Sequence, residues 1–186
     1  MNRRPLLSTF VLALACCAPL STLAGCRATR ASDLAGMYER SMKQNDRVAS
    51  PDGIQRQMER DARQRKKVVK LVEAGKLETA ANHFHAAALL ANSDSLEEVD
   101  LAVELALMAA EMGDDRGFPV AAEAIDRGLL KRGMPQRFGT QYVWEPVIGK
   151  WDLYTWNEKT TDAERRAMGV PTLAEALARV ERLNAD

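Results

Sequence analysis

Helix-forming runs separated by glycine and proline make up most of this chain and constrain its fold most strongly. Apolar residues recur at helical spacing through residues 33–132, and the runs stop at Gly75, Gly113 and Gly133, since glycine is favoured just past a helix C-terminus. The pattern predicts helices over residues 33–44, 51–75, 78–92, 95–112 and 117–132, with a short one from 162 and a last one over 172–183. We therefore expect a mainly α fold, an antiparallel bundle of helical hairpins.

The composition changes after residue 137, where aromatic residues become frequent. Six of the nine aromatic residues that follow the first 25 positions lie within residues 138–156. Strand-forming residues in 141–144 and 150–154 flank a Pro/Gly-containing loop, which predicts a small β-hairpin at about 141–155, in the C-terminal third. Two strands alone are only marginally stable, so the hairpin must pack on the helices. Residues 33–186 are therefore expected to form a single α-helical domain with a β-hairpin insertion.

The N-terminus resembles a bacterial lipoprotein signal. Arg3 and Arg4 precede an apolar run, and Leu23-Ala24-Gly25-Cys26 resembles a lipobox, which is cut before a diacylated cysteine. This predicts a signal peptide over 1–25, a lipidated (palmitate-bearing) Cys26 and a short tether over 26–32. Arg27 then favours the outer membrane, facing the periplasm. Two alternatives are ordinary cleavage near Ala24 and an uncleaved membrane helix.

Cysteine positions and charge exclude several classes of function. All three cysteines lie at or before Cys26, so the processed domain has no free thiol for a disulfide, for catalysis or for a metal. Its slight excess of acidic over basic residues argues against nucleic-acid binding. His83 and His85 are two apart and so point to different sides of a helix. We expect neither a metal nor another cofactor.

Residues 54–72 form an amphipathic pattern with an unusual feature. At 100° per residue they have an apolar stripe of Ile54, Met58, Ala62, Val69 and Val72, and an opposite face with Arg56, Arg60, Arg63, Lys66, Lys67 and Lys70. The basic face is either a solvated surface or a contact for anionic envelope polymers or lipid headgroups. Asp61 and Arg65 fall on the apolar stripe four residues apart. They are interpreted as an ion pair that fixes helix packing, or Arg65 lines a pocket for a carboxylate or phosphate.

The candidate ligand-binding residues lie around one Gly/Pro-containing segment. Besides Arg65 and His85 they are Asp126, Arg127, Gln136, Arg137, Thr140 and Gln141. Their donors and acceptors suit a polar ligand, and the neighbouring aromatic residues suit a sugar ring. The alternative is that these side chains cap helix carbonyls and satisfy hairpin backbone groups. His85 is either a packing residue or a general base.

Several of these motifs resemble an uncharacterised bacterial family, a domain of unknown function. The matching features are Asp61 with Arg65, His85-Ala86-Ala87, Asp126-Arg127, the Pro-Gln-x-aromatic-Gly-Thr-Gln box at 135–141, Thr-Thr-Asp-x-Glu-Arg at 160–165, and Val170-Pro171. The similarity covers about residues 55–180, and Gly128 departs from it because the family has a larger residue there. The resemblance implies a shared fold but no activity, cofactor or catalytic residue.

Two functional hypotheses follow. The first is an envelope lipoprotein that binds a protein or a cell-wall glycan through the aromatic hairpin and the Gly-Thr-Gln loop. The second is a hydrolase of an envelope substrate, with His85 or Asp126 as the base, Arg127 or Arg65 holding an anion, and Gln141 nearby. No nucleophile elbow or phosphate-binding glycine loop is present, so the sequence favours binding.

Overall fold

The computed structural model describes residues 30–45 and 51–185; the predicted signal peptide and Cys26 lie outside these residues. The described residues form seven helices and two strands. In chain order these are α1 (Asp33–Asn45), α2 (Pro51–Glu73), α3 (Ala80–Leu90), α4 (Leu96–Glu111), α5 (Gly117–Lys131), β1 (Tyr142–Glu145), β2 (Lys150–Leu153), α6 (Asp162–Ala167) and α7 (Leu173–Leu183). The predicted mainly α fold with a small β-hairpin is confirmed.

The helix ends follow the local signals in the sequence. Gly75, Gly113 and Gly133 each follow a helix with a positive φ, of 61°, 94° and 71°, a conformation that costs glycine little. At the other ends, the hydroxyls of Thr79, Ser95, Thr161 and Thr172 accept hydrogen bonds from backbone N–H groups of the first turn. These local contacts explain why the predicted and observed boundaries differ by only a few residues.

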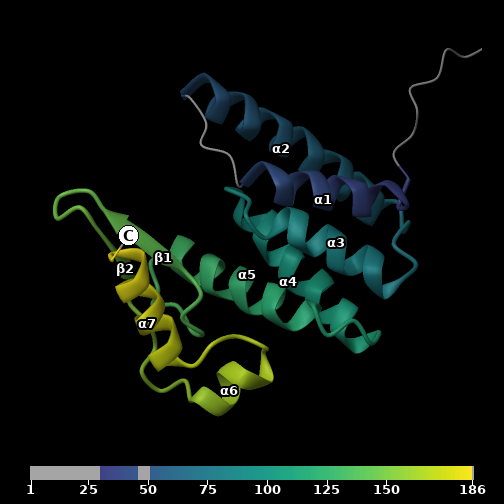
Figure 1. Cartoon of the computed structure of the whole chain (residues 1–186). Coiled ribbons are helices and arrows are strands. Elements are labelled where there is room, and N and C mark those ends of the chain that lie inside the picture. The colour runs from purple at the N-terminus through teal and green to yellow at the C-terminus, as the bar shows by residue number, and fades with distance from the viewer. Residues whose placement is uncertain (1–29, 46–50, 186) are drawn as a thin grey trace, which may run out of the picture.

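Helices α3, α4 and α5 form the centre of the domain, with α4 packed against both of the others (Figure 1). Their contact surfaces consist largely of alanines, including Ala86, Ala87, Ala102, Ala106, Ala121 and Ala124, which are all fully buried. Small side chains allow the helix backbones to approach closely. Gly117, at the start of α5, shows how closely, because a Cβ added there would lie 2.2 Å from the Ala106 carbonyl oxygen.

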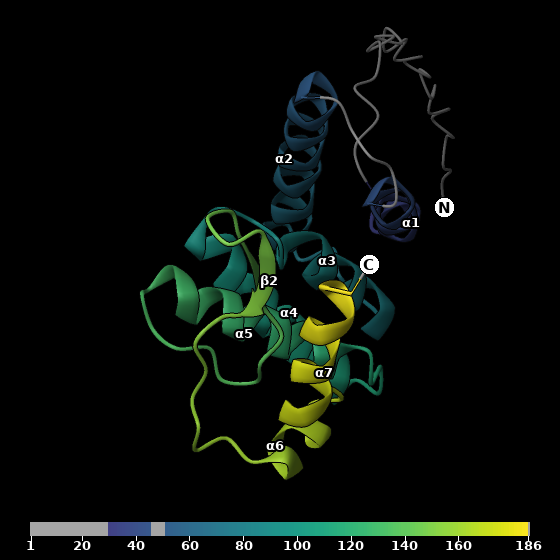
Figure 2. The same cartoon turned by 60° about the vertical axis from the view of Figure 1, so that its left-hand side comes forward.

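Helix α2 is packed along only part of its length. Val68 and Leu71, in its C-terminal half, are buried against the core, whereas Ile54 and Met58 in its N-terminal half remain 51% and 53% exposed. Figure 2 shows this N-terminal half standing out from the rest of the domain. Val69 and Val72, the C-terminal members of the predicted stripe, are half-buried against the core. The buried apolar residues among the described part of α2 are Val68 and Leu71, which the predicted stripe did not include.

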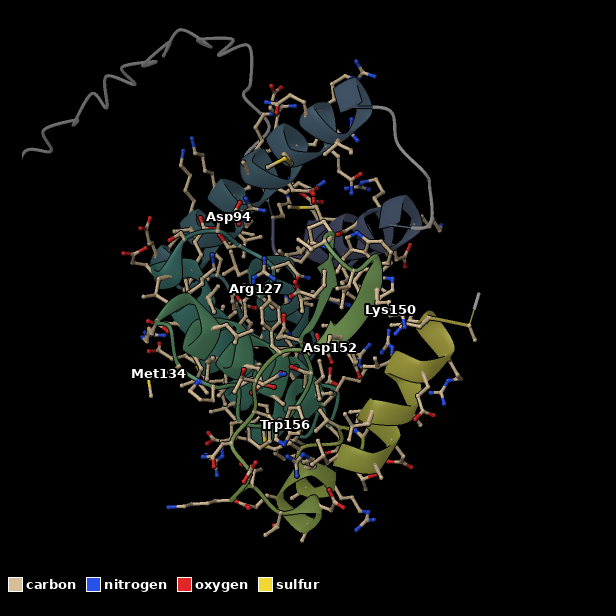
Figure 3. The ribbon with its side chains drawn as sticks, turned by 90° about the vertical axis from the view of Figure 1, so that its left-hand side faces the viewer. Asp94, Arg127, Met134, Lys150, Asp152 and Trp156 are labelled. Carbon is tan, nitrogen blue, oxygen red and sulfur yellow. The ribbon has the colours of Figure 1, made fainter. Side chains whose placement is uncertain are left out.

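The hairpin and the last two helices form the second part of the domain. Strand β1 pairs antiparallel with β2, with Trp144 opposite Trp151, and β2 packs against α7. A small buried cluster of Ala122, Phe138 and Val170 joins this part to α5. In Figures 1, 2 and 3, α2 lies at the top of the molecule and α6 at the bottom.

The described domain contains its own core. Both hydrophobic clusters are built from residues between Ala31 and Val170, and the first buried residue among those that the structure describes is Leu34. A domain with a complete core folds by itself. Residues 27–186 contain every described residue of this core and therefore suit experiments on the domain without its N-terminal segment.

Candidate functional site

The Asp126 carboxylate holds the loop of residues 137–140, which belongs to the candidate ligand-binding segment predicted from the sequence. Asp126 lies on α5 and is fully buried. One oxygen, Oδ1, accepts hydrogen bonds from the backbone N–H groups of Arg137 and Phe138, at 2.6 and 2.8 Å. The other, Oδ2, accepts from the N–H and hydroxyl of Thr140, at 3.0 and 2.8 Å. Four donors thus converge on one carboxylate, which holds residues 137–140 against the helix.

Gln136 joins this loop to the hairpin and is also fully buried. Its side-chain amide nitrogen donates to the carbonyls of Gln141 and Tyr154, at 3.1 and 2.8 Å, and its side-chain oxygen accepts from the Gln141 N–H at 2.9 Å. Its backbone adds bonds to Thr155 and Asn157. The Gln136 side chain therefore fixes the two ends of the hairpin, the residue before β1 and the residue after β2.

Arg165 completes this polar network and is not one of the candidate residues predicted from the sequence. It is fully buried on α6, and it donates to the carbonyl oxygens of Phe138 and Thr160 at 3.1 and 2.6 Å. Its Nη2 finds no hydrogen-bond partner among the described residues. The sequence feature that includes it is the Thr-Thr-Asp-x-Glu-Arg motif at residues 160–165, and that motif by itself predicts nothing about the burial of Arg165.

Arg127 and Arg65 belong to a second polar network, at the turn between α3 and α4. Arg127 donates to the carbonyls of Asn92 and Ser93, at 3.4 and 3.3 Å. Arg65 pairs with Glu98 of α4 at 3.0 Å, and the Ser93 hydroxyl donates to the same Glu98 oxygen. The alternative expectation, that these side chains satisfy backbone groups, describes Arg127 well.

The predicted Asp61–Arg65 pair is not the ion pair that the structure forms. Both residues lie on the same side of α2, but the long Arg65 side chain reaches across to α4, where Glu98 is held by Ser93. An ion pair between two helices ties them together, which a pair within α2 would not do. Arg65 therefore does fix helix packing, with a different partner from the one expected.

His85 lies in a separate place, between α1 and the start of α5. Its ring is 5.3 Å from that of Tyr38 and 5.2 Å from that of Phe84, measured between centroids. The Arg116 guanidinium lies over the Phe84 ring, 4.1 Å from its centroid. Burial and then the positive charge of Arg116 lower the pKa of His85 from its ordinary value of 6.5. These contacts match the packing interpretation of His85.

The structure therefore separates the residues that the hydrolase hypothesis grouped. Asp126 binds the 137–140 loop, Arg127 binds the α3–α4 turn, and His85 packs against Tyr38. Gln141 donates to the Glu123 carbonyl and the Thr140 hydroxyl, at 3.4 and 3.2 Å. Their polar atoms are largely used by the protein itself, in three different places.

A groove beside the Asp126-bound loop is the best candidate for a binding site. It has a volume of about 660 Å³, and its two walls are the segment containing Met134, Pro135 and Arg137 and the segment 156–160. Trp156 lines it, and so do Arg137 and Glu164, which form an ion pair of 3.1 Å. Figure 3 shows Met134 and Trp156 in the lower half of the molecule, far from α2. Of the candidate residues, Arg137 lines this groove directly.

The polar network makes the groove rigid. Gln136 forms a parallel bridge with Trp156, which fixes one wall relative to the other. Arg165 is bonded to Thr160 at the end of the second wall. Asp126 and Gln136 do not line the groove, but they hold in place the segments whose side chains do.

Within residues 30–45 and 51–185, no group of three His, Cys, Asp or Glu side chains is placed to hold a metal ion. Among the same residues, no helix is both long and apolar enough to cross a membrane.

Comparisons with known proteins add no information on function. No protein-family model, no curated protein and no solved structure matches this chain. The resemblance to an uncharacterised bacterial family therefore stays a prediction. What the structure itself defines is a mainly helical domain with a polar network behind a tryptophan-lined groove.

Proposed function

We propose that this chain is a lipid-anchored envelope protein whose helical domain binds a cell-wall glycan in the groove beside Trp156. The lipobox at residues 23–26 supports the anchor at Cys26 and a position at the outer membrane, facing the periplasm. The observation that carries the binding function is the groove of about 660 Å³ with a half-buried tryptophan in its wall. That volume is within the usual range for small-molecule sites.

The chemistry of the groove suits a sugar. One face of a pyranose ring presents C–H groups, which pack well on the apolar surface of an indole. Trp156 provides that surface, and Met134 and Pro135 add apolar wall beside it. Asn157 and Lys159 line the same groove and offer donors and an acceptor for ring hydroxyls.

Binding is better supported than hydrolysis. A hydrolase needs a base and an anion-holding group that face one substrate. Here Asp126 accepts four hydrogen bonds from the protein and His85 packs between two aromatic rings elsewhere. The groove holds Glu164, but its carboxylate already bonds Arg137 and caps α6 through Thr161.

The test is binding of soluble peptidoglycan disaccharide-peptides to residues 27–186, measured by isothermal titration calorimetry. Trp156→Ala should weaken binding by about tenfold or more, because buried tryptophans commonly dominate a binding interface. Trp144→Ala is the matched control, since Trp144 is also partly exposed but packs on Trp151 in the hairpin. Equal affinity of wild type and Trp156→Ala would exclude this groove as the site.

Lipid anchoring is tested separately in cells. Metabolic labelling with radioactive palmitate should mark the wild-type chain and leave Cys26→Ser unlabelled. Labelling of both proteins would contradict Cys26 as the attachment site.

A further inference from the structure

The exposed face of α2 is strongly basic. Arg56, Arg63, Lys66, Lys67 and Lys70 are all exposed, whereas Val68 and Leu71 on the other side of the helix are buried against the core. Burial therefore settles the orientation of the helix, with its basic face directed away from the domain. The helix has 23 residues, which corresponds to a length of about 35 Å.

The charge on this face is largely uncompensated. Arg63 forms one weak ion pair, with Glu59 at 3.8 Å between two exposed side chains. Among the described residues, Arg56, Lys66, Lys67 and Lys70 make no ion pair, and Glu59 and Glu73 are the acidic side chains exposed along the same helix. Exposed arginines elsewhere on the domain are of both kinds: Arg116, Arg132 and Arg137 each bind a carboxylate. Arg166 and Arg182 make no ion pair among the described residues.

The basic helix α2 lies close to the point where the N-terminal segment of the chain joins the domain. Helix α1, the first described element, packs beside α2 at the top of the molecule (Figure 1). The seven residues from Cys26 to Ser32 span at most about 25 Å. A lipid on Cys26 would therefore keep α1 and α2 close to the bilayer surface.

We propose that the basic face of α2 binds the anionic phospholipid headgroups of the membrane that holds Cys26. This inference rests on the proposed anchor. Lysines and arginines near an anionic bilayer are attracted to it individually and their effects add. With α2 against the membrane, Trp156 lies in the half of the molecule that is away from the lipid (Figure 3). The helix thus supplies a second contact that orients the binding site towards the cell wall.

The test uses residues 27–186, which lack Cys26, so that only the protein surface contributes to binding. Flotation is measured with vesicles of phosphatidylcholine alone and of phosphatidylcholine mixed with phosphatidylglycerol. Wild type should float with the anionic vesicles only, and binding should weaken as salt is raised. The triple change Lys66→Gln, Lys67→Gln and Lys70→Gln should reduce the affinity by roughly a hundredfold, about fivefold for each side chain.

A matched control removes the same number of charges elsewhere. Lys150, Arg166 and Arg182 are exposed on the hairpin, α6 and α7, and their triple change to Gln should leave vesicle binding within about twofold of wild type. Thermal unfolding of both variants verifies that they fold.

Three results would overturn the proposal: no binding of wild type to anionic vesicles, equal loss in both triple variants, or tighter binding to a soluble polyanion such as heparin than to vesicles. The last would identify the partner as an anionic polymer. None of these results affects the calorimetric test of the Trp156 groove, so the two proposals fail separately.

Discussion

The two parts of this domain are held together by different kinds of interaction. Helices α3, α4 and α5 pack largely through buried alanines, and their polar contacts, such as Arg127 with the α3–α4 turn and Arg132 with Asp100, lie outside that apolar core. In the second part, the buried Asp126 of α5 holds the 137–140 loop, Gln136 bonds that loop to the hairpin, and Arg165 bonds it to α6. A small apolar cluster lies beside these polar side chains. The groove lies in the second part.

The difference shows what each kind of interaction is suited to. Apolar packing is not directional, and it stabilises a helix bundle through the area that it buries. Hydrogen bonds to buried groups are directional, and each one fixes a particular atom of a loop that has no regular structure. The walls of the groove are irregular segments, and the hydrogen bonds of the polar network keep them in one conformation.

The largest effect is expected from removing the central carboxylate. Asp126→Ala leaves the N–H groups of Arg137, Phe138 and Thr140 without their acceptor, and each unsatisfied buried donor costs about 1–3 kcal/mol. We expect a loss of about 3–5 kcal/mol, which lowers the midpoint of thermal unfolding by about 10 °C or more. Asp126→Asn keeps one acceptor oxygen and should lose roughly half as much. Unfolding of Asp126→Ala at the wild-type temperature would show that the network contributes little stability.

A smaller effect is expected in the alanine-packed part, where space rather than hydrogen bonding is limiting. Gly117→Ala would place a methyl group 2.2 Å from the Ala106 carbonyl oxygen and 2.9 Å from the Ala110 nitrogen. Because both are backbone atoms, α4 and α5 must move apart, at a cost of about 1–3 kcal/mol. The control is Gly36→Ala, whose new methyl group meets only the flexible Arg40 side chain at 3.2 Å. If calorimetry finds equal midpoints for the two variants, the α4–α5 contact is looser than described.

The smallest effect concerns pH and tests His85 in the first part of the domain. Folding lowers the pKa of His85 through burial and the charge of Arg116, so below about pH 6.5 the unfolded chain binds more protons than the folded one. The contribution of His85 to the free energy of unfolding is therefore complete above that pH and declines as the pH falls. The difference in unfolding midpoint between about pH 7.5 and about pH 5.5 should be smaller in His85→Gln than in wild type. An unchanged difference would assign the acid sensitivity to other groups.

Sequence patterns anticipated much of the candidate site, and particular residues show where they stopped. Asp126, Gln136, Thr140 and Gln141 were expected together and do lie in one hydrogen-bonded network, because they are close in the chain and flank one turn. His85 was grouped with them and lies elsewhere.

Contacts between residues far apart in the chain were not predicted from the sequence patterns. The Arg65 partner came from another helix, and the burial of Arg165 depends on a carbonyl 27 residues away, that of Phe138. No local pattern carries such information.

The sequence by itself determined the helices and their ends, the site of the hairpin and the basic face of α2. Each of these depends on residues close together in the chain, through periodicity, capping or glycine stops. Only the tertiary structure decided that the polar residues near Asp126 mostly hold the loop, and that Trp156, rather than the Trp144–Trp151 pair, lines the groove. These outcomes depend on which segments meet in space, because a buried donor bonds whichever acceptor the packing of the helices brings to it.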